Sequence, residues 1–392
     1  MRTTLCASAM GWLVLSALLA SCPAVAADAP PLPDVVSGDV LSTDVQKLKD
    51  RITFWINTIG DAKAEPNAVY AARDMLIGDY AQVDKKGAGY KFAELAAAVA
   101  APVLSKGFGA DPLAKAREIG LAMALSQMPR ASVQPALEAM VNCDRNPAVR
   151  YFGWKGYRQA RTVVLGLGPS ATQKVLASVD RAARTETSGP ALEQLFGMLT
   201  LETVKPEVVS KEMWDLTQKR TLAAMSNNWR NWCQMVVLGD EEVAEACQRA
   251  VLAVRSRLDW IGQDKEPRKL ILQMFVDMGF CAAKGFAQAS SDGRPADAFS
   301  ALLLTCEEAL NAATRAGKVF IKTPLEDPKV AANPDILIIC LVPGKENCGV
   351  LAWADFLKDQ GVVAPNPADY RRRTAGTPAS GPATRPTPGP GK

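Results

Sequence analysis

Apolar residues recur at steps of three and four between residues 43 and 320, which is the period of one face of an α-helix. The first segment shows the pattern in Val45, Leu48, Ile52, Trp55, Ile56 and Ile59, and Gly60 follows as a stop. The pattern therefore predicts an all-α chain. Beyond the first segment, helices are expected over residues 69–83, 90–104, 113–128, 133–141, 149–165, 171–183, 191–199, 208–225, 229–238, 243–261, 270–286 and 296–313.

Several of these segments open with a proline, which suits the first helical turn because its missing N–H would be unbonded there anyway. The prolines sit at positions 66, 112, 147, 190 and 267, and their spacings are 46, 35, 43 and 77 residues, the last close to two units. Intervals of this size are typical of repeated helix pairs. The sequence thus predicts an irregular array of helix pairs.

One segment start resembles a known repeat family. The run Asn146-Pro147-Ala148-Val149-Arg150 is similar to the Asp/Asn-x-x-Val-Arg opening of HEAT and armadillo-type repeats, and residues 111–115 are a looser copy. The other starts keep the proline but lose the Val-Arg pair. The resemblance covers roughly residues 62–290, and it implies an α-solenoid without implying an activity.

The architecture leaves two alternatives open. A solenoid stacks its units around a continuous core and commonly binds a partner on its curved surface. A closed ring of helix pairs, an (α/α) toroid, would produce the same periodicity and is used by several carbohydrate-processing enzymes. We expect residues 43–320 to form one helical repeat domain in either case, because composition does not shift before residue 320.

The N-terminal residues have the features of an export signal. Arg2 precedes an apolar stretch over residues 10–20 that is too short to span a bilayer. Cleavage after Ala26 would remove residues 1–26, whereas Leu19-Ala20-Ser21-Cys22 resembles a lipobox in which Cys22 would carry a lipid. Residues 27–42 are rich in proline and small residues, as expected for a linker. We therefore expect a protein of the periplasm, cell envelope or extracellular space.

The C-terminal residues change in texture after the last predicted helix. Within residues 321–363, the apolar run 336–342 predicts a buried strand, and a turn around Gly344 would make a hairpin that sets Cys340 opposite Cys348. Opposed strand residues are close enough for a disulfide. A short helix is expected over residues 351–358, and residues 364–392 read as a disordered Pro/Gly/Arg tail.

Charge is unevenly distributed along the chain. The whole sequence has 45 basic and 41 acidic residues, and residues 369–392 hold five of the basic ones against one acid. The body between signal and tail is therefore close to neutral, which argues against nucleic acid as a partner because phosphate binding needs a basic surface. In the tail, Arg371, Arg372 and Arg373 could contact an anionic envelope polymer or lipid.

Histidine is absent from the sequence, and this limits the available chemistry. Ser-His-Asp and Cys-His catalysis, HExxH zinc sites and haem attachment through CxxCH are all excluded. No cofactor, metal site or catalytic residue is predicted. The cysteines after the signal are not spaced as CxxC and fall on apolar helix faces, so core packing is favoured over interhelical disulfides. They are Cys143, Cys233, Cys247, Cys281, Cys306, Cys340 and Cys348.

Few residues remain as candidates for a binding site. Trp229 and Trp232 could form an aromatic platform for a sugar or a peptide, although their spacing also fits a core stripe. The acids are scattered over several helices and suit capping and solvation. We therefore predict a non-catalytic, exported helical-repeat scaffold that binds a protein or an envelope polymer. The alternative is a carboxylate-dependent carbohydrate-active enzyme on a toroid.

Overall fold

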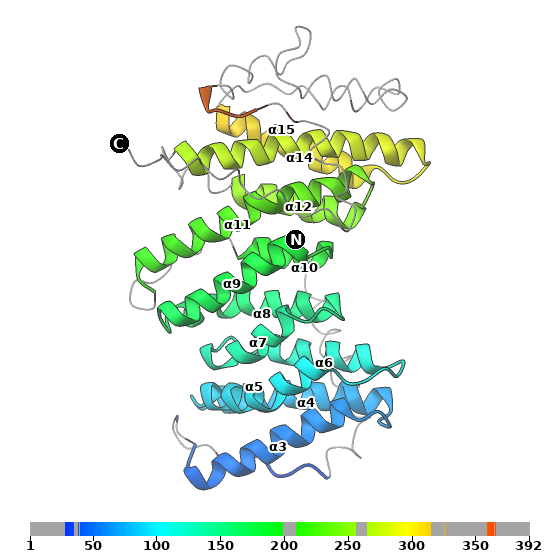
Figure 1. Cartoon of the computed structure of the whole chain (residues 1–392). Helices are drawn as coiled ribbons and strands as arrows, with labels where there is room; N and C mark the ends of the chain where they lie inside the picture. The colour runs from blue at the N-terminus through cyan, green and yellow to red at the C-terminus, as the bar shows by residue number, and fades with distance from the viewer. Residues whose placement is uncertain are drawn as a thin grey trace, which may run out of the picture.

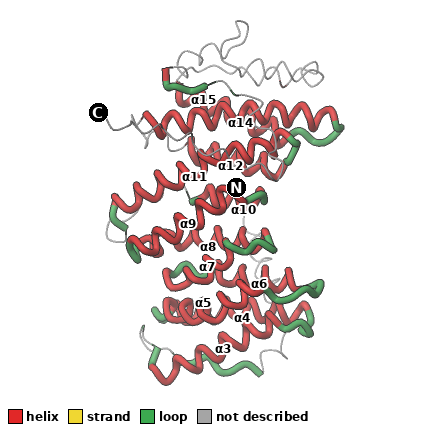
Figure 2. Tube along the Cα trace, viewed as in Figure 1, coloured by secondary structure: helices red, strands yellow, loops and turns green. Residues whose placement is uncertain are grey.

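The computed structural model describes residues 28–34, 40–198, 209–255, 265–314 and 359–363, together with Gly38, Leu325 and Pro365. These residues form an all-α protein, and no strand occurs among them (Figure 2). The elements are α3 Ser42–Gly60, α4 Pro66–Lys85, α5 Gly89–Lys106, α6 Ala114–Ser126, the 3-10 turn η1 Ala131–Val133, α7 Gln134–Val141, α8 Pro147–Leu165, α9 Pro169–Thr185, α10 Gly189–Gly197, α11 Lys211–Val237, α12 Glu241–Arg255, α14 Lys265–Ser291 and α15 Asp297–Thr314.

Most predicted helices are confirmed to within a few residues, because each apolar stripe becomes a buried helix face. One prediction is wrong: the sequence predicts separate helices over residues 208–225 and 229–238, but α11 is a single helix of 27 residues. The predicted break falls at the polar residues 226–228. Asparagine and serine lower helix propensity only slightly, and packing of α11 against α9 and α14 is sufficient to override that preference.

The proline starts are confirmed in part. Pro66 and Pro147 occupy the first turn of α4 and α8, and the Asn146 side chain caps α8 by accepting a hydrogen bond from the Ala148 N–H at 3.2 Å. Pro112, in contrast, lies in the turn before α6. Pro169 opens α9 directly after Gly168, whose φ of +99° is a backbone conformation that glycine adopts without strain. The loop 166–168 is therefore a sharp reversal between two helices.

The helices are stacked along one long axis, with α3 at one end and α14 and α15 at the other (Figure 1). From α5 onward, most helices pack extensively against the helix two places further along, whereas α7 packs mainly against α8 and α14 mainly against α15. This produces two rows of helices. The first row contains α5, α7, α9, α11 and α14, and the second contains α4, α6, α8, α10, α12 and α15. One continuous apolar core extends through both rows, from Leu48 of α3 to Ala313 of α15.

Helix α14 is the most enclosed element. Its stretch Arg268–Ser291 is long and apolar enough to cross a membrane by length and composition alone. The most apolar 18-residue part of it is 78% buried inside the protein, between α11, α12 and α15. Core helices of this kind are apolar on all sides because they have neighbours on all sides.

Extended segments pack on both ends of the stack. Near the N-terminus, Ala29 and Leu32 lie against the core, and the Arg51 guanidinium donates a hydrogen bond to the Pro30 carbonyl. Residues 28–34 contain no helix, as expected for a linker. They are nevertheless packed against the helices. Near the C-terminus, Val362 is buried, and the Gln273 amide exchanges two hydrogen bonds of 2.9 and 3.0 Å with the Val363 backbone.

Several predicted features lie outside the described residues. They are the signal segment 1–26 with Cys22, the hairpin with Cys340 and Cys348, the short helix 351–358, and the tail with Arg371, Arg372 and Arg373. The predictions made for them stay predictions.

Candidate functional site

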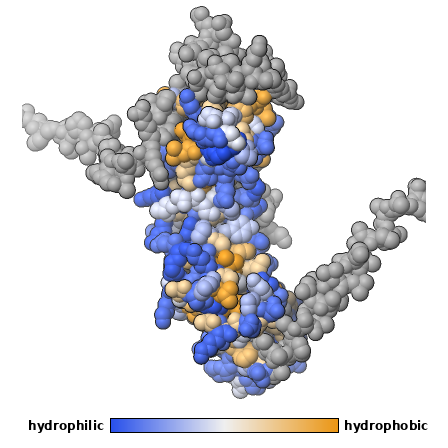
Figure 3. Space-filling view, turned by 90° about the vertical axis from the view of Figure 1, so that its right-hand side faces the viewer, coloured by the Kyte–Doolittle hydropathy of each residue, from blue (hydrophilic) through white to orange (hydrophobic). Residues whose placement is uncertain are grey.

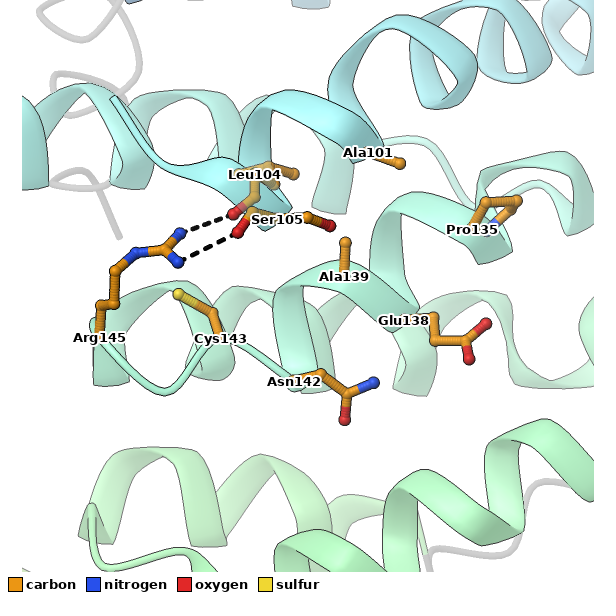
Figure 4. Close-up of a pocket in the computed structure, with 9 residues that line it drawn as sticks. All are labelled: Ala101, Leu104, Ser105, Pro135, Glu138, Ala139, Asn142, Cys143 and Arg145. Atoms are coloured by element: carbon orange, nitrogen blue, oxygen red, sulfur yellow. Dashed lines mark hydrogen bonds between the residues drawn. The ribbon is translucent and has the colours of Figure 1, made fainter. Parts of the chain in front are cut away.

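A surface pocket of about 360 Å³ lies between α5, α7 and the loop that follows α7 (Figure 4). Arg145 borders it, but its guanidinium is turned toward the end of α5. It donates to the Leu104 carbonyl at 2.7 Å and to the Ser105 carbonyl at 3.1 Å, and lies 3.5 Å from the Glu118 carboxylate. These contacts satisfy carbonyls that the helix itself leaves unpaired. Arg145 is therefore used as a helix cap at this pocket.

The residues that line the pocket do not include a pair of carboxylates that could act as general acid and general base. Glu138 is its single carboxylate, and the other lining groups are Ala101, Pro135, Ala139, Asn142 and Cys143. Glycoside hydrolysis by two carboxylates requires both to flank the scissile bond at about 5–9.5 Å from each other. The lining therefore offers no support for the carbohydrate-active alternative.

The aromatic platform predicted at Trp229 and Trp232 is wrong. The two side chains are only 2% and 1% exposed. The Trp229 indole N–H donates to the Asp277 carboxylate at 3.0 Å across the contact between α11 and α14. The sequence does contain the signal for this arrangement. Because α11 is continuous, both tryptophans extend the apolar stripe of Leu222 and Met225, which the assumed break at 226–228 interrupted.

The five described cysteines are all buried free thiols, as the core-packing interpretation predicted. Burial raises the pKa of the Cys233, Cys247 and Cys306 thiols well above its usual value, so these groups stay protonated at neutral pH. Within the described residues, no group of three or more cysteines and acids is arranged to hold a metal ion.

The two rows of helices differ sharply in charge over the second half of the stack. In the first row, α9, α11 and α14 together contain eleven basic and five acidic residues. In the second row, α10, α12 and α15 together contain two basic and seven acidic residues. Over this half of the stack, a basic stretch of the first row therefore lies beside an acidic stretch of the second row. Summing charge along the chain hid this difference, because successive helices alternate between the rows.

The basic row presents its charge to solvent on α9 and α11. Lys174, Arg181 and Arg184 are exposed, and their spacing of seven and three residues puts them on one side of α9. Arg220 and Arg230 are exposed on α11, and Arg220 lies 4.0 Å from Asp180 of α9, which shows that the two helices meet at this height. We call these five residues the basic face.

Most cations of the basic face lack an acidic partner among the residues that the structure describes. Lys174, Arg181, Arg184 and Arg230 form no ion pair with the described part of the chain. In the acidic row, by comparison, Arg249 pairs with Glu193 and Arg255 pairs with Glu308. Uncompensated cations on neighbouring helices create a positive potential that attracts an acidic partner.

Exposed leucines border the basic face. Leu167 precedes α9 and is 59% exposed, and Leu216 on α11 is 48% exposed. Single exposed apolar residues also occur elsewhere, and Figure 3 shows small apolar groups within a mainly hydrophilic surface on one side of the stack. The combination of uncompensated cations with nearby leucines is the arrangement that distinguishes α9 and α11.

The described part of the protein is an all-α stack of helices in which one row is basic over the second half of the stack. No protein-family model, no curated protein and no solved structure matches the chain.

Proposed function

We propose that this protein is a non-catalytic, exported helical-repeat scaffold that binds an acidic macromolecule in the cell envelope through its basic face. The two-row packing and the separation of α3 from α15 support an open α-solenoid over a closed toroid (Figure 1). Divergent HEAT-like repeats, suggested by the helix start at Asn146-Pro147, belong to the same proposal.

The charge difference between the two rows is the observation that carries this proposal. A partner that met both rows equally would gain little from electrostatic attraction. A partner on the basic face would be drawn to the cations of α9 and α11 and would find Leu167 and Leu216 beside them. We infer that the partner is an acidic protein segment with apolar side chains, because a purely polyanionic polymer would make no use of the leucines.

Photo-crosslinking tests the proposed interface. A photoreactive amino acid replaces Ala177, which is exposed on α9 between Lys174 and Arg181. A matched probe replaces Leu252, which is exposed on α12 in the acidic row. On illumination of intact cells, we expect a protein adduct from position 177 that position 252 does not give. Combining the first probe with Lys174→Glu, Arg181→Glu and Arg184→Glu should reduce the adduct at least about tenfold, since charge reversal repels an acidic partner.

Salt dependence provides the control for this experiment. In lysate, raising the salt concentration from about 0.05 to 0.5 M should weaken the adduct from position 177, because the Debye length falls to a few ångströms. Identical adducts from both positions, or an adduct that survives charge reversal, would contradict the proposed interface. An adduct with lipid or polysaccharide in place of protein would contradict the inferred class of partner.

The proposed export has a separate test in the N-terminus of the protein isolated from cells. We expect the chain to begin at Ala27, or at Cys22 with a lipid on its sulfur, because either form follows from processing of the segment 1–26. Mass spectrometry of the intact N-terminal peptide distinguishes the two forms. A chain that keeps Met1 or Arg2 in fractionated cells would refute export by this route.

A further inference from the structure

Four buried cysteines gather in the last two helix pairs of the stack. Cys233, Cys247, Cys281 and Cys306 come one each from α11, α12, α14 and α15, and each side chain is fully buried. Within this group, the thiols of Cys233 and Cys281 are in hydrogen-bond contact across the α11–α14 boundary. Alanine or valine could also fill these core positions. Packing therefore does not explain why two cysteines meet across this boundary.

The helix register fixes this contact from both sides. One turn before it, the Trp229 N–H donates to Asp277. One turn after it, the Val236 carbonyl would lie 2.4 Å from a Cβ atom placed on Gly285, so the two backbones come very close there. Residue numbers increase in the same direction on both helices at all three contacts. The helices are therefore parallel, in a fixed register, and close together at the height of the cysteines.

We propose that Cys233 and Cys281 form an interhelical disulfide when the protein folds in an oxidising compartment, joining α11 covalently to α14. The proposal rests on the proposed export for its occurrence in cells, whereas the geometry that permits the bond belongs to the fold. Disulfides require Cβ atoms about 3.5–4.5 Å apart. The close approach of the two backbones at Gly285, one turn away, brings the parallel helices together at the height of this pair.

The chemistry of the bond requires an external disulfide as oxidant. The Cys281 thiolate attacks a sulfur of glutathione disulfide or of a thiol–disulfide oxidoreductase, and the displaced thiolate leaves. Cys233, as thiolate, then attacks the mixed disulfide and releases the second reduced thiol. Two S–H bonds of the protein and the S–S bond of the oxidant are broken, one S–S bond forms in the protein, and the two electrons and two protons leave with the two released thiols. Because both thiols are enclosed in the finished fold, the exchange takes place while α14 is still docking.

Refolding the full chain in a glutathione redox buffer tests the proposal without reliance on export. Free thiols are trapped with N-ethylmaleimide at the end of folding. Digestion with trypsin and a glutamate-specific protease separates Cys233 from Cys247, which share one tryptic peptide. Mass spectrometry should then find the peptide of Cys233 linked to the peptide of Cys281. Linkage of Cys233 to another cysteine as the main product, or no linkage of it, would overturn the proposal.

Matched variants separate cross-linking from packing. Cys233→Ser and Cys281→Ser should each abolish the linked peptide and leave the other thiol free, whereas Cys143→Ser and Cys306→Ser should retain the link. Wild-type protein should melt about 5–10 °C higher when oxidised than after reduction, since the bond closes a loop of 48 residues in the unfolded chain. The two variants of the pair should show no such shift, and a shift that persisted in them would contradict the assignment.

Protein isolated from cells then distinguishes this proposal from the proposed function. The linked peptide in protein from cells supports both the bond and export to an oxidising site. The linked peptide after refolding, with free thiols in protein from cells, retains the bond as a property of the fold and refutes export. Its absence after refolding refutes the bond whatever the location of the protein.

Discussion

Replacing Asp79 with alanine is expected to lower the free energy of unfolding by about 3–5 kcal/mol. Asp79 lies on α4 with its side chain 2% exposed. Its carboxylate accepts hydrogen bonds from the Arg51 guanidinium at 2.6 and 3.0 Å and from the Trp55 indole N–H at 2.7 Å. The Arg51 guanidinium also lies over the Trp55 ring, at 5.3 Å from its centroid. One carboxylate thus holds two side chains of α3.

The size of the effect follows from what the substitution leaves behind. Without Asp79, the Trp55 N–H loses its acceptor and the largely buried Arg51 cation keeps its hydrogen bond to the Pro30 carbonyl but loses its counter-charge, and a buried charge without a counter-charge is costly. Because stacked helix pairs contact mainly their neighbours, the loss should fall on the N-terminal end of the stack. Urea unfolding followed by circular dichroism measures the total, and hydrogen exchange should show faster exchange in α3 and α4 than in α14.

Asp74→Ala provides a matched control on the same helix. Asp74 pairs with Arg73 at 2.7 Å, but its side chain is 61% exposed, and exposed ion pairs contribute about 0–1 kcal/mol. We therefore expect Asp74→Ala to change stability by less than about 1 kcal/mol. If Asp79→Ala were no more destabilising than Asp74→Ala, the buried network between α3 and α4 would not have the role assigned to it.

Replacing Trp229 with alanine should also destabilise the protein by about 3–5 kcal/mol, the range for truncating a large aromatic residue in a core. The indole fills the contact between α11 and α14, and its N–H binds Asp277, which is itself buried. Trp229→Phe should cost less, about 1–3 kcal/mol, because it keeps most of the apolar volume and removes only the donor. Denaturant unfolding measures both variants.

The comparison that decides the role of Trp229 is Leu216→Ala on the same helix. Leu216 is an exposed apolar residue, so its truncation should change stability by no more than about 0.5 kcal/mol. If Trp229 were part of an exposed binding platform, Trp229→Ala would also change stability very little, since an exposed aromatic ring contributes little to the fold. If Trp229→Ala and Leu216→Ala lowered stability by equally small amounts, Trp229 would not be a core residue, and the exposed binding platform predicted from the sequence would be the better interpretation.

Several features are determined by the amino-acid sequence alone. The period of the apolar residues defines the helices, because a helix can bury one face only if its apolar residues recur along that face. Pro66 and Pro147 predict helix starts correctly, and Asn146 is identified as a residue that precedes one. The lack of histidine excludes whole classes of catalysis, because those reactions need an imidazole wherever the chain places its other residues. These statements depend on local spacing or on composition.

Other features were decided only by the tertiary structure. Periodicity shows which side of a helix is apolar, but it does not say which neighbour covers that side. The pairing of Trp229 with Asp277, the contact of Cys233 with Cys281, and the support of Arg51 by Asp79 all join residues at least 28 positions apart. The basic face also depends on the tertiary structure. Alternate helices lie in different rows, so charges that cancel along the chain are separated in space.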